Sequence, residues 1–119
     1  LICFPLRFKR ERQTVQRVGE LSRYPFELVE KFSCHRLVTD KTPPAFLWHT
    51  TTDAAVHVSN SLRYASALAK YQIPFAMHIY PFGPHGLATV DAQTNGPLPE
   101  AVQLAKTWLP ELMAWLKVT

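Results

Sequence analysis

The spacing of apolar residues changes several times along the chain, and each change predicts an element. Residues 45–49 form a compact, mostly apolar run, which is typical of a strand buried on both faces. From 59 to 71, apolar residues (Leu62, Ala65, Leu68 and Ala69) recur at steps of three and four. This spacing predicts an amphipathic helix that ends before Pro74. A second strand is predicted over 75–80, and a Gly- and Pro-containing loop over 83–97.

The two flanks of the chain complete the predicted order of elements. Residues 1–5 are a short apolar run of strand type, and a short helix is predicted over 25–33. After Pro99 a longer helix is expected, and because Pro110 interrupts it, either a kink or two abutting helices are expected near Trp108. Its apolar face consists of Ala101, Leu104, Ala105, Trp108, Leu112, Trp115 and Leu116. The alternation of strands and helices predicts an α/β fold, with about three parallel strands between two layers of helices.

Composition narrows the class of protein. At 119 residues and 47% apolar content, the chain is long enough for one domain, or part of one, with a real core. No apolar run approaches the roughly 20 residues of a membrane helix, and no signal-peptide pattern opens the chain. The two cysteines, Cys3 and Cys34, lack metal-type spacing and are expected to be buried free thiols. These observations favour a cytoplasmic protein without a membrane partner.

Charge and histidine content argue against two further classes. The net charge of +4 comes from residues 1–36, whose basic residues are mixed with Glu and lack interleaved aromatics. A solvated surface is therefore expected there, and no nucleic-acid partner. The five histidines have no regular metal spacing, so neither a zinc site nor another cofactor is expected. Two of them, His49 and His78, lie in predicted strands and are expected to be packed or hydrogen-bonded.

Asp53 and His85 are the candidates for chemistry. Asp53 comes directly after the first central strand and three threonines, and His85 follows the next strand between two glycines. Because parallel strands end at the same edge of a sheet, the two side chains are expected to lie close together there. A carboxylate in that place can orient an imidazole and stabilise its protonated form. Taken singly, Asp53 is also explained as a turn cap and His85 as a surface residue.

The order of acid before histidine is also that of α/β hydrolases, in which the nucleophilic serine comes earlier still. The sequence resembles the carboxyl-terminal half of their acetyl esterase branch, which is related to acetylxylan esterases and to prolyl-oligopeptidase-type hydrolases. The resemblance is carried by Thr42-Pro43-Pro44-Ala45-Phe46-Leu47-Trp48-His49-Thr50, Asp53, Val56, Val58, Asn60-Ser61-Leu62, Ile73-Pro74-Phe75 and His85-Gly86-Leu87. It implies that Asp53 is the triad acid and His85 the general base. Two positions depart from the family pattern: His57 replaces a common proline, and Pro84 a frequent glycine.

The same resemblance implies a division of the chain. Residues 1–119 would be one partial domain, in which 6–42 is a variable segment that covers the active site. Residues 43–119 would be a βαβα block that carries the acid and the histidine. The chain contains no G-x-S-x-G, and none of its serines lies at a predicted strand-to-helix turn (Ser22, Ser33, Ser59, Ser61 and Ser66). The nucleophile and the oxyanion loop are therefore expected upstream of Leu1, and the isolated chain is expected to be inactive.

The function that follows is a segment of a serine carboxylesterase acting on a small-molecule ester, most simply an acetyl ester. One alternative is a peptidase or a dienelactone-hydrolase-like enzyme that uses the same two residues. The other is a non-catalytic interaction module, whose open sheet edge would bind a partner chain. That edge also leads us to expect a homo-oligomer or association with the amino-terminal half of the fold.

Overall fold

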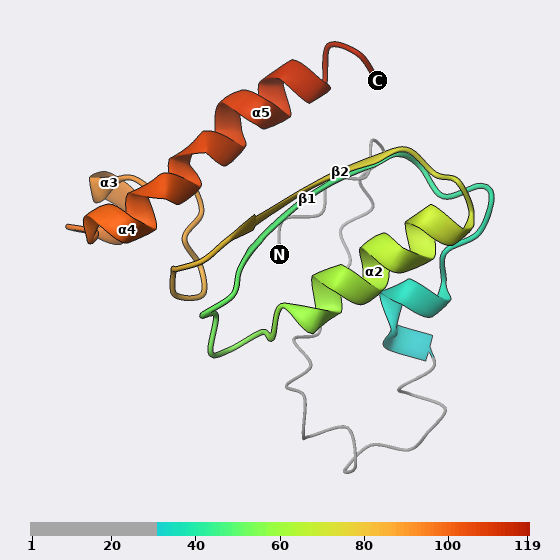
Figure 1. The fold of residues 1–119 in the computed structure, drawn as a ribbon, viewed down its shortest axis with the longest axis horizontal. Helices are drawn as coiled ribbons and strands as arrows, with labels where there is room; N and C mark the ends of the chain where they lie inside the picture. Colours follow the sequence, from blue (N-terminus) through green and yellow to red (C-terminus); the bar gives the residue numbers. More distant parts are fainter. Residues whose placement is uncertain (1–30) are drawn as a thin grey trace.

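The computed structural model describes residues 31–119 and contains a parallel pair of strands between two layers of helices (Figure 1). Strand β1 spans Ala45–Thr50 and strand β2 spans Phe75–Tyr80, with helix α2, Ser59–Lys70, between them. These three elements have the bounds that the apolar spacing predicts, to within one residue. The strand predicted over 1–5 and most of the helix predicted over 25–33 lie outside the described residues.

The two strands run parallel and in direct register. Ala45 pairs with Phe75, and the pairing continues without a bulge to Thr50 opposite Tyr80. Because the strands are parallel, the segments that follow Thr50 and Tyr80 leave the sheet at the same edge. About three strands were predicted, and residues 31–119 contain two.

Each face of the sheet packs against its own helical layer. Helix α2 lies against one face, and the carboxyl-terminal helices lie against the other (Figure 1). Alternate residues of β1 divide between the two cores: Phe46 and Trp48 on the side of the carboxyl-terminal helices, Ala45 and Leu47 on the side of α2. All six residues of β1 are buried, as the continuous apolar run predicted.

Helix α2 is amphipathic, but its buried face is not the predicted one. The buried residues are Ser61, Ala65 and Leu68, spaced by four and three. Leu62 is half exposed and Ala69 is exposed, so two of the four predicted core positions were wrong. A serine takes the place expected of an apolar residue, because Ser61 has a buried hydrogen-bond partner that the apolar spacing does not reveal.

The carboxyl-terminal segment is three short helices in line: α4, Glu100–Gln103, a 3₁₀ turn η3, Leu104–Thr107, and α5, Trp108–Trp115. The change of helix type falls where Pro110 removes an N–H that would bond four residues back. Its buried positions are Val102, Ala105, Trp108 and Leu112, whereas the predicted Ala101, Leu104 and Leu116 are exposed. The interruption expected near Trp108 is present as the boundary between η3 and α5. The tighter winding of the 3₁₀ turn changes which side chains face the core, so the predicted apolar face is only partly the buried one.

Two smaller elements belong to the described fold. A single helical turn, α3, Ala92–Asn95, lies within the segment predicted as loop, and Asp91 caps it by accepting from the Thr94 N–H at 2.7 Å. A 3₁₀ turn, η2, Cys34–Arg36, precedes β1, and its Cys34 thiol is exposed, contrary to prediction. Cys3 lies outside the described residues. Across residues 31–119, no helix has the length and apolar character to cross a bilayer.

Candidate active site

Asp53 is held in a tight turn just beyond β1. One carboxylate oxygen, Oδ1, accepts hydrogen bonds from the backbone N–H groups of Ala55 at 2.9 Å and Val56 at 2.8 Å. The side chain is only 5% exposed. Asp favours such turns because its short side chain can bond to backbone two and three residues ahead. This geometry satisfies Oδ1 and leaves Oδ2 directed elsewhere.

His85 meets that second oxygen. Its Nδ1 lies 2.9 Å from Asp53 Oδ2, and its side chain is 43% exposed. Since a carboxylate only accepts hydrogen bonds, Nδ1 carries the proton and Nε2 of the neutral ring keeps its lone pair. The structure therefore brings the two predicted site residues into contact, with the acid buried and the imidazole open to solvent.

Three consecutive threonines, the last residue of β1 and the two that follow, hold the histidine loop against the acid. The Thr50 hydroxyl donates to the Gly83 carbonyl at 2.7 Å, and the Thr51 hydroxyl donates to the Pro81 carbonyl at 2.6 Å. The Thr52 hydroxyl accepts from the Gly83 N–H at 2.8 Å. Sequence analysis noted these threonines only as neighbours of Asp53. A run of three hydroxyl side chains at a strand end was the signal for a loop clamp.

Gly83 is required at the centre of that clamp. Its φ of +151° lies in a region that L side chains rarely adopt. A Cβ there would come within 2.5 Å of the Leu87 Cδ1 and 2.8 Å of the Thr50 Cγ2. The backbone of the histidine loop thus packs directly on the end of β1, which fixes where the loop begins.

Beyond His85 the loop is anchored to the core. Leu87 and Val90 are buried in the cluster that underlies the carboxyl-terminal helices. The Trp108 indole Nε1–H donates to the Ala88 carbonyl at 3.0 Å. Ala88 and Val90 both have positive φ, +41° and +58°, which is uncommon for Ala and unfavourable for a β-branched residue. The tertiary packing holds this strained backbone in place.

A second histidine lies behind Asp53. His49, at the end of β1, has a side chain that is 1% exposed. Its Nδ1 is 2.6 Å from the Ser61 Oγ, and its Nε2 is 2.9 Å from the Val56 carbonyl and 3.5 Å from Asp53 Oδ2. Sequence analysis expected His49 to be packed or hydrogen-bonded, and it is both. His78, on β2, stacks on the Phe46 ring with centroids 5.0 Å apart.

Burial and hydrogen bonding set the charge of these groups in opposite ways. Burial raises the pKa of Asp53, but donation from the Val56 N–H, from His85 and from the Ala55 N–H outweighs it, so the pKa is lowered overall. Burial lowers the pKa of His49, against the weaker raising effects of the Val56 carbonyl and Asp53. The buried pair therefore consists of a stabilised carboxylate and a neutral imidazole.

Other aromatic and histidine residues of these segments lie around this centre. Trp48 and Tyr80 belong to the core, whereas Phe82 is half exposed. His57 is exposed and accepts from the Ser59 N–H at 3.2 Å, before α2. Among residues 31–119, no group of three or more His, Cys, Asp and Glu side chains is placed to hold a metal ion.

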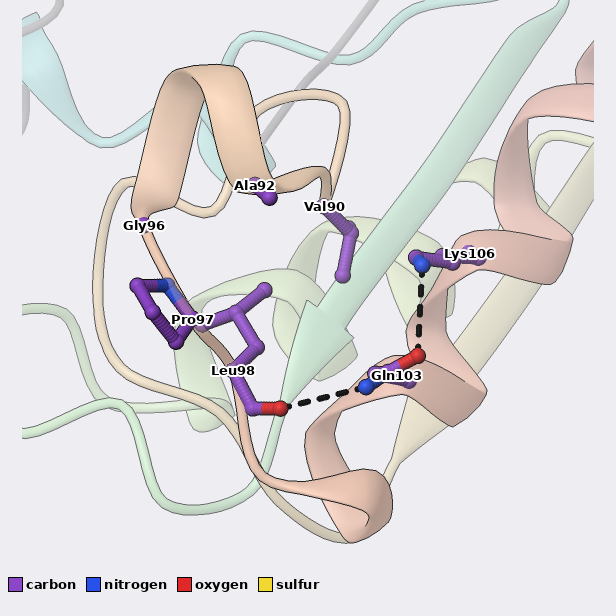
Figure 2. Close-up of a pocket in the computed structure, with 7 residues that line it drawn as sticks. All are labelled: Val90, Ala92, Gly96, Pro97, Leu98, Gln103 and Lys106. Atoms are coloured by element: carbon purple, nitrogen blue, oxygen red, sulfur yellow. Dashed lines mark hydrogen bonds between the residues drawn. The ribbon is translucent and has the colours of Figure 1, made fainter.

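A separate pocket of about 210 Å³ lies between the end of the histidine loop and the start of the carboxyl-terminal helices (Figure 2). Gln103 spans its wall, donating to the Leu98 carbonyl and accepting from Lys106. Neither Asp53 nor His85 lines it. The remaining lining residues are Val90, Ala92, Gly96 and Pro97.

A parallel sheet with helices on both faces, and an acid–histidine pair at its carboxyl edge, is the arrangement expected in an α/β hydrolase. The model of the prolyl oligopeptidase family matches residues 12–109. The chain therefore belongs to the prolyl oligopeptidase family, which confirms the resemblance found in the sequence.

Individual relatives agree with this assignment. A carboxylesterase from Lactobacillus plantarum WCFS1 superposes with a TM-score of 0.64 at 36% identity, over 70% of this chain and 31% of that one. An acetyl ester-xyloside bifunctional hydrolase from Caldicellulosiruptor lactoaceticus superposes with a TM-score of 0.55 at 42% identity, over 74% and 32%. Endo-1,4-beta-xylanase B of Butyrivibrio fibrisolvens is 45% identical over 60 residues, which are 50% of this chain and 9% of that protein. The chain thus spans about a third of these solved structures and a smaller share of the xylanase.

Proposed function

We propose that this chain supplies the acid and the base of a serine carboxylesterase that hydrolyses small acyl esters, acetyl esters first among them. The observation that carries the proposal is the contact between Asp53 Oδ2 and His85 Nδ1 at 2.9 Å, with the acid buried and the imidazole exposed. An imidazole oriented in this way has its basic nitrogen free to receive a proton from a nucleophile.

In the proposed reaction, a serine upstream of Leu1 attacks the ester carbonyl. His85 Nε2 takes the serine proton and then transfers it to the departing alcohol, which leaves an acyl-serine. A water molecule then attacks the acyl group while His85 accepts its proton. Transfer of that proton to the serine oxygen breaks the acyl–serine bond, releases the acid and regenerates the free serine and the neutral imidazole. Asp53 stays ionised throughout, because its lowered pKa keeps it anionic while it stabilises the imidazolium.

The preference for small acyl groups rests on the relatives. Two of the similar structures are named as a carboxylesterase and as a hydrolase of acetyl esters and xylosides. The name of the family itself keeps a peptidase as the alternative. Comparing p-nitrophenyl acetate, longer acyl esters and proline-containing peptides as substrates distinguishes the two reactions.

The test is the hydrolysis of p-nitrophenyl acetate by the full-length protein and two variants. We expect His85→Ala and Asp53→Asn to lower kcat on the order of 10³-fold or more, because the base is lost in one and its orientation in the other. His35→Ala is the matched control, since it removes an imidazole from η2. Unchanged turnover in His85→Ala would overturn the proposal.

One further measurement separates this proposal from a non-catalytic role, and a second tests whether the upstream residues are needed for activity. A fluorophosphonate probe should label the full-length protein at a serine, whereas an interaction module would remain unlabelled. The 119 residues alone should hydrolyse no ester, because the proposed nucleophile and oxyanion donors lie outside them.

A further inference from the structure

His49 is a buried titratable group that the proposed reaction does not use. It occupies the fifth of the six positions of β1 and stands four residues before Asp53. The residue is 2% exposed, so neither substrate nor solvent reaches it directly. Burying an imidazole in a core is unfavourable unless both ring nitrogens find hydrogen-bond partners, because they lose those that water supplied.

The partners of His49 determine which nitrogen carries its proton. The Val56 carbonyl can only accept, so Nε2, 2.9 Å away, must be the donor. Nδ1 is then the acceptor, and the Ser61 hydroxyl donates to it at 2.6 Å. Ser61 is completely buried in the first turn of α2, so its hydroxyl has been placed on this nitrogen by the packing of the helix. Burial also lowers the pKa of His49, in agreement with a neutral ring.

This hydrogen bonding links His49 to the catalytic acid through Val56. Val56 is held at its N–H by Asp53 Oδ1 and at its carbonyl by His49 Nε2. The same Nε2–H faces Asp53 Oδ2 at 3.5 Å, on the oxygen that accepts from His85. Among residues 31–119, the charged and titratable groups that act on His49 are Asp53 and, beyond it, His85.

We propose that His49 is a positioning residue for the acid: its Nε2–H, oriented by Ser61, fixes the 53–56 turn and thereby aims Asp53 Oδ2 at His85. The inference rests on the proposed function, since it assigns His49 to the same reaction. It predicts that His49 affects the rate of the chemical steps and leaves substrate binding unchanged, because His49 touches only the support of the acid.

Two substitutions separate positioning from packing. His49→Gln retains a donor in place of the Nε2–H, whereas His49→Leu fills the same volume without one. If His49 only packs the core, leucine should serve at least as well as glutamine, because it leaves no polar group to satisfy. If His49 positions the acid, glutamine should recover activity that leucine loses.

The experiment measures kcat and KM for ester hydrolysis by the full-length protein, with the folded fraction checked by near-UV circular dichroism. We expect His49→Leu to lower kcat about tenfold to a hundredfold, with KM changed by less than about twofold, because a small displacement of a catalytic group is enough for such a loss. His49→Gln should recover most of kcat. Ser61→Ala should lower kcat less, while Ser66→Ala, on the exposed side of α2, should have no effect.

A readout independent of turnover is the downfield ¹H NMR resonance of the His85 Nδ1 proton, which reports the bond to Asp53. It should be present in the wild type and in His49→Gln, and shifted or broadened in His49→Leu. If the leucine variant does not fold, the comparison of kcat between Ser61→Ala and Ser66→Ala tests the inference in its place.

Three results would overturn the inference: a wild-type kcat and resonance in His49→Leu, glutamine no better than leucine, or Ser61→Ala equal to Ser66→Ala after leucine fails to fold. Loss of activity in His85→Ala together with any of them would remove His49 from the mechanism and leave the proposed function standing. Activity that survives His85→Ala would instead remove the proposed function.

Discussion

The two residues of the candidate site are held in opposite ways. Asp53 is buried, and the backbone groups that bind its Oδ1 come from within three residues of it. His85 is exposed, and its loop is fixed from a distance, by threonines more than 30 residues away and by Trp108 on α5. One residue is therefore placed by local sequence and the other by the assembled fold.

The difference indicates which changes each side should tolerate. A local hydrogen-bonded turn depends on residues close to it in sequence, which for Asp53 include His49 on β1, and so depends less on distant packing. A loop with positive φ at Ala88 and Val90 keeps that backbone only while the core around it is intact. Damage to packing should consequently displace His85 before it displaces Asp53.

The largest effect is expected from Gly83→Ala. The added methyl group would overlap the Leu87 and Thr50 side chains and would also strain the backbone. We expect a loss of about 2–4 kcal/mol in the free energy of unfolding, measured with urea, and a lower kcat from a displaced His85. Gly96→Ala is the matched control, since its φ is +70° but nothing lies within 4 Å of the new Cβ. Equal losses in the two variants would show that backbone strain alone matters and that the clamp does not.

A smaller effect is expected from Trp108→Phe. This change removes the Nε1–H that binds the Ala88 carbonyl and preserves a ring that can stack on Trp48, whose centroid lies 5.3 Å away. We expect a loss of about 1–3 kcal/mol from the unsatisfied carbonyl and reduced packing, with kcat lowered by a few-fold. Trp115→Phe alters the same helix at a half-buried ring against Phe46 and should leave kcat unchanged. A wild-type kcat in Trp108→Phe would mean that α5 does not hold the histidine loop.

The smallest effect is expected in the dependence of stability on pH, and it comes from Asp53 and from His49 behind it. The pKa of His49 is lowered below its ordinary value of 6.5 in the folded state, so the unfolded chain binds more protons as the pH falls. Stability is therefore lost from about pH 6.5 downward, through the folded pKa of His49.

Asp53 acts in the same direction at lower pH. Its folded pKa lies below 3.8, so its contribution is complete well above pH 3.8 and is lost as the pH falls through the folded value. Urea unfolding at a series of pH values should show His49→Gln with a flatter profile between pH 5 and 7, since the titrating group is absent, whereas Asp53→Asn should flatten it only below about pH 4. Identical profiles for wild type and His49→Gln would contradict a neutral, buried His49.

Much of the fold followed from patterns that each element carries within itself. The run over 45–49 indicated a strand buried on both sides, because only such a strand lacks polar alternation. Pro74 marked the end of α2, and the parallel strands then placed Asp53 and His85 at one edge. Each of those conclusions rests on the residues of a single segment, together with the general rule that parallel strands end at the same edge of a sheet.

The missed features depend on pairs of distant residues. Ser61 was not recognised as a core position, because its partner His49 is twelve residues away. Leu104 and Leu116 are exposed although they were assigned to the apolar face, because the predicted spacing did not include the 3₁₀ turn η3. The role of the threonines required the Gly83 loop to be folded back on them. Spacing alone contains no information on such contacts.

The direct register of β1 and β2 also has a practical consequence for attaching other groups to this molecule. The turn from α2 into β2, Tyr71 to Pro74, lies at the amino edge of the sheet, opposite the edge that carries Asp53 and His85. Gln72 at its tip is exposed and has a φ of +55°, so a glycine-containing linker suits its backbone. A peptide tag or a surface tether inserted there would leave the reactive edge facing outward.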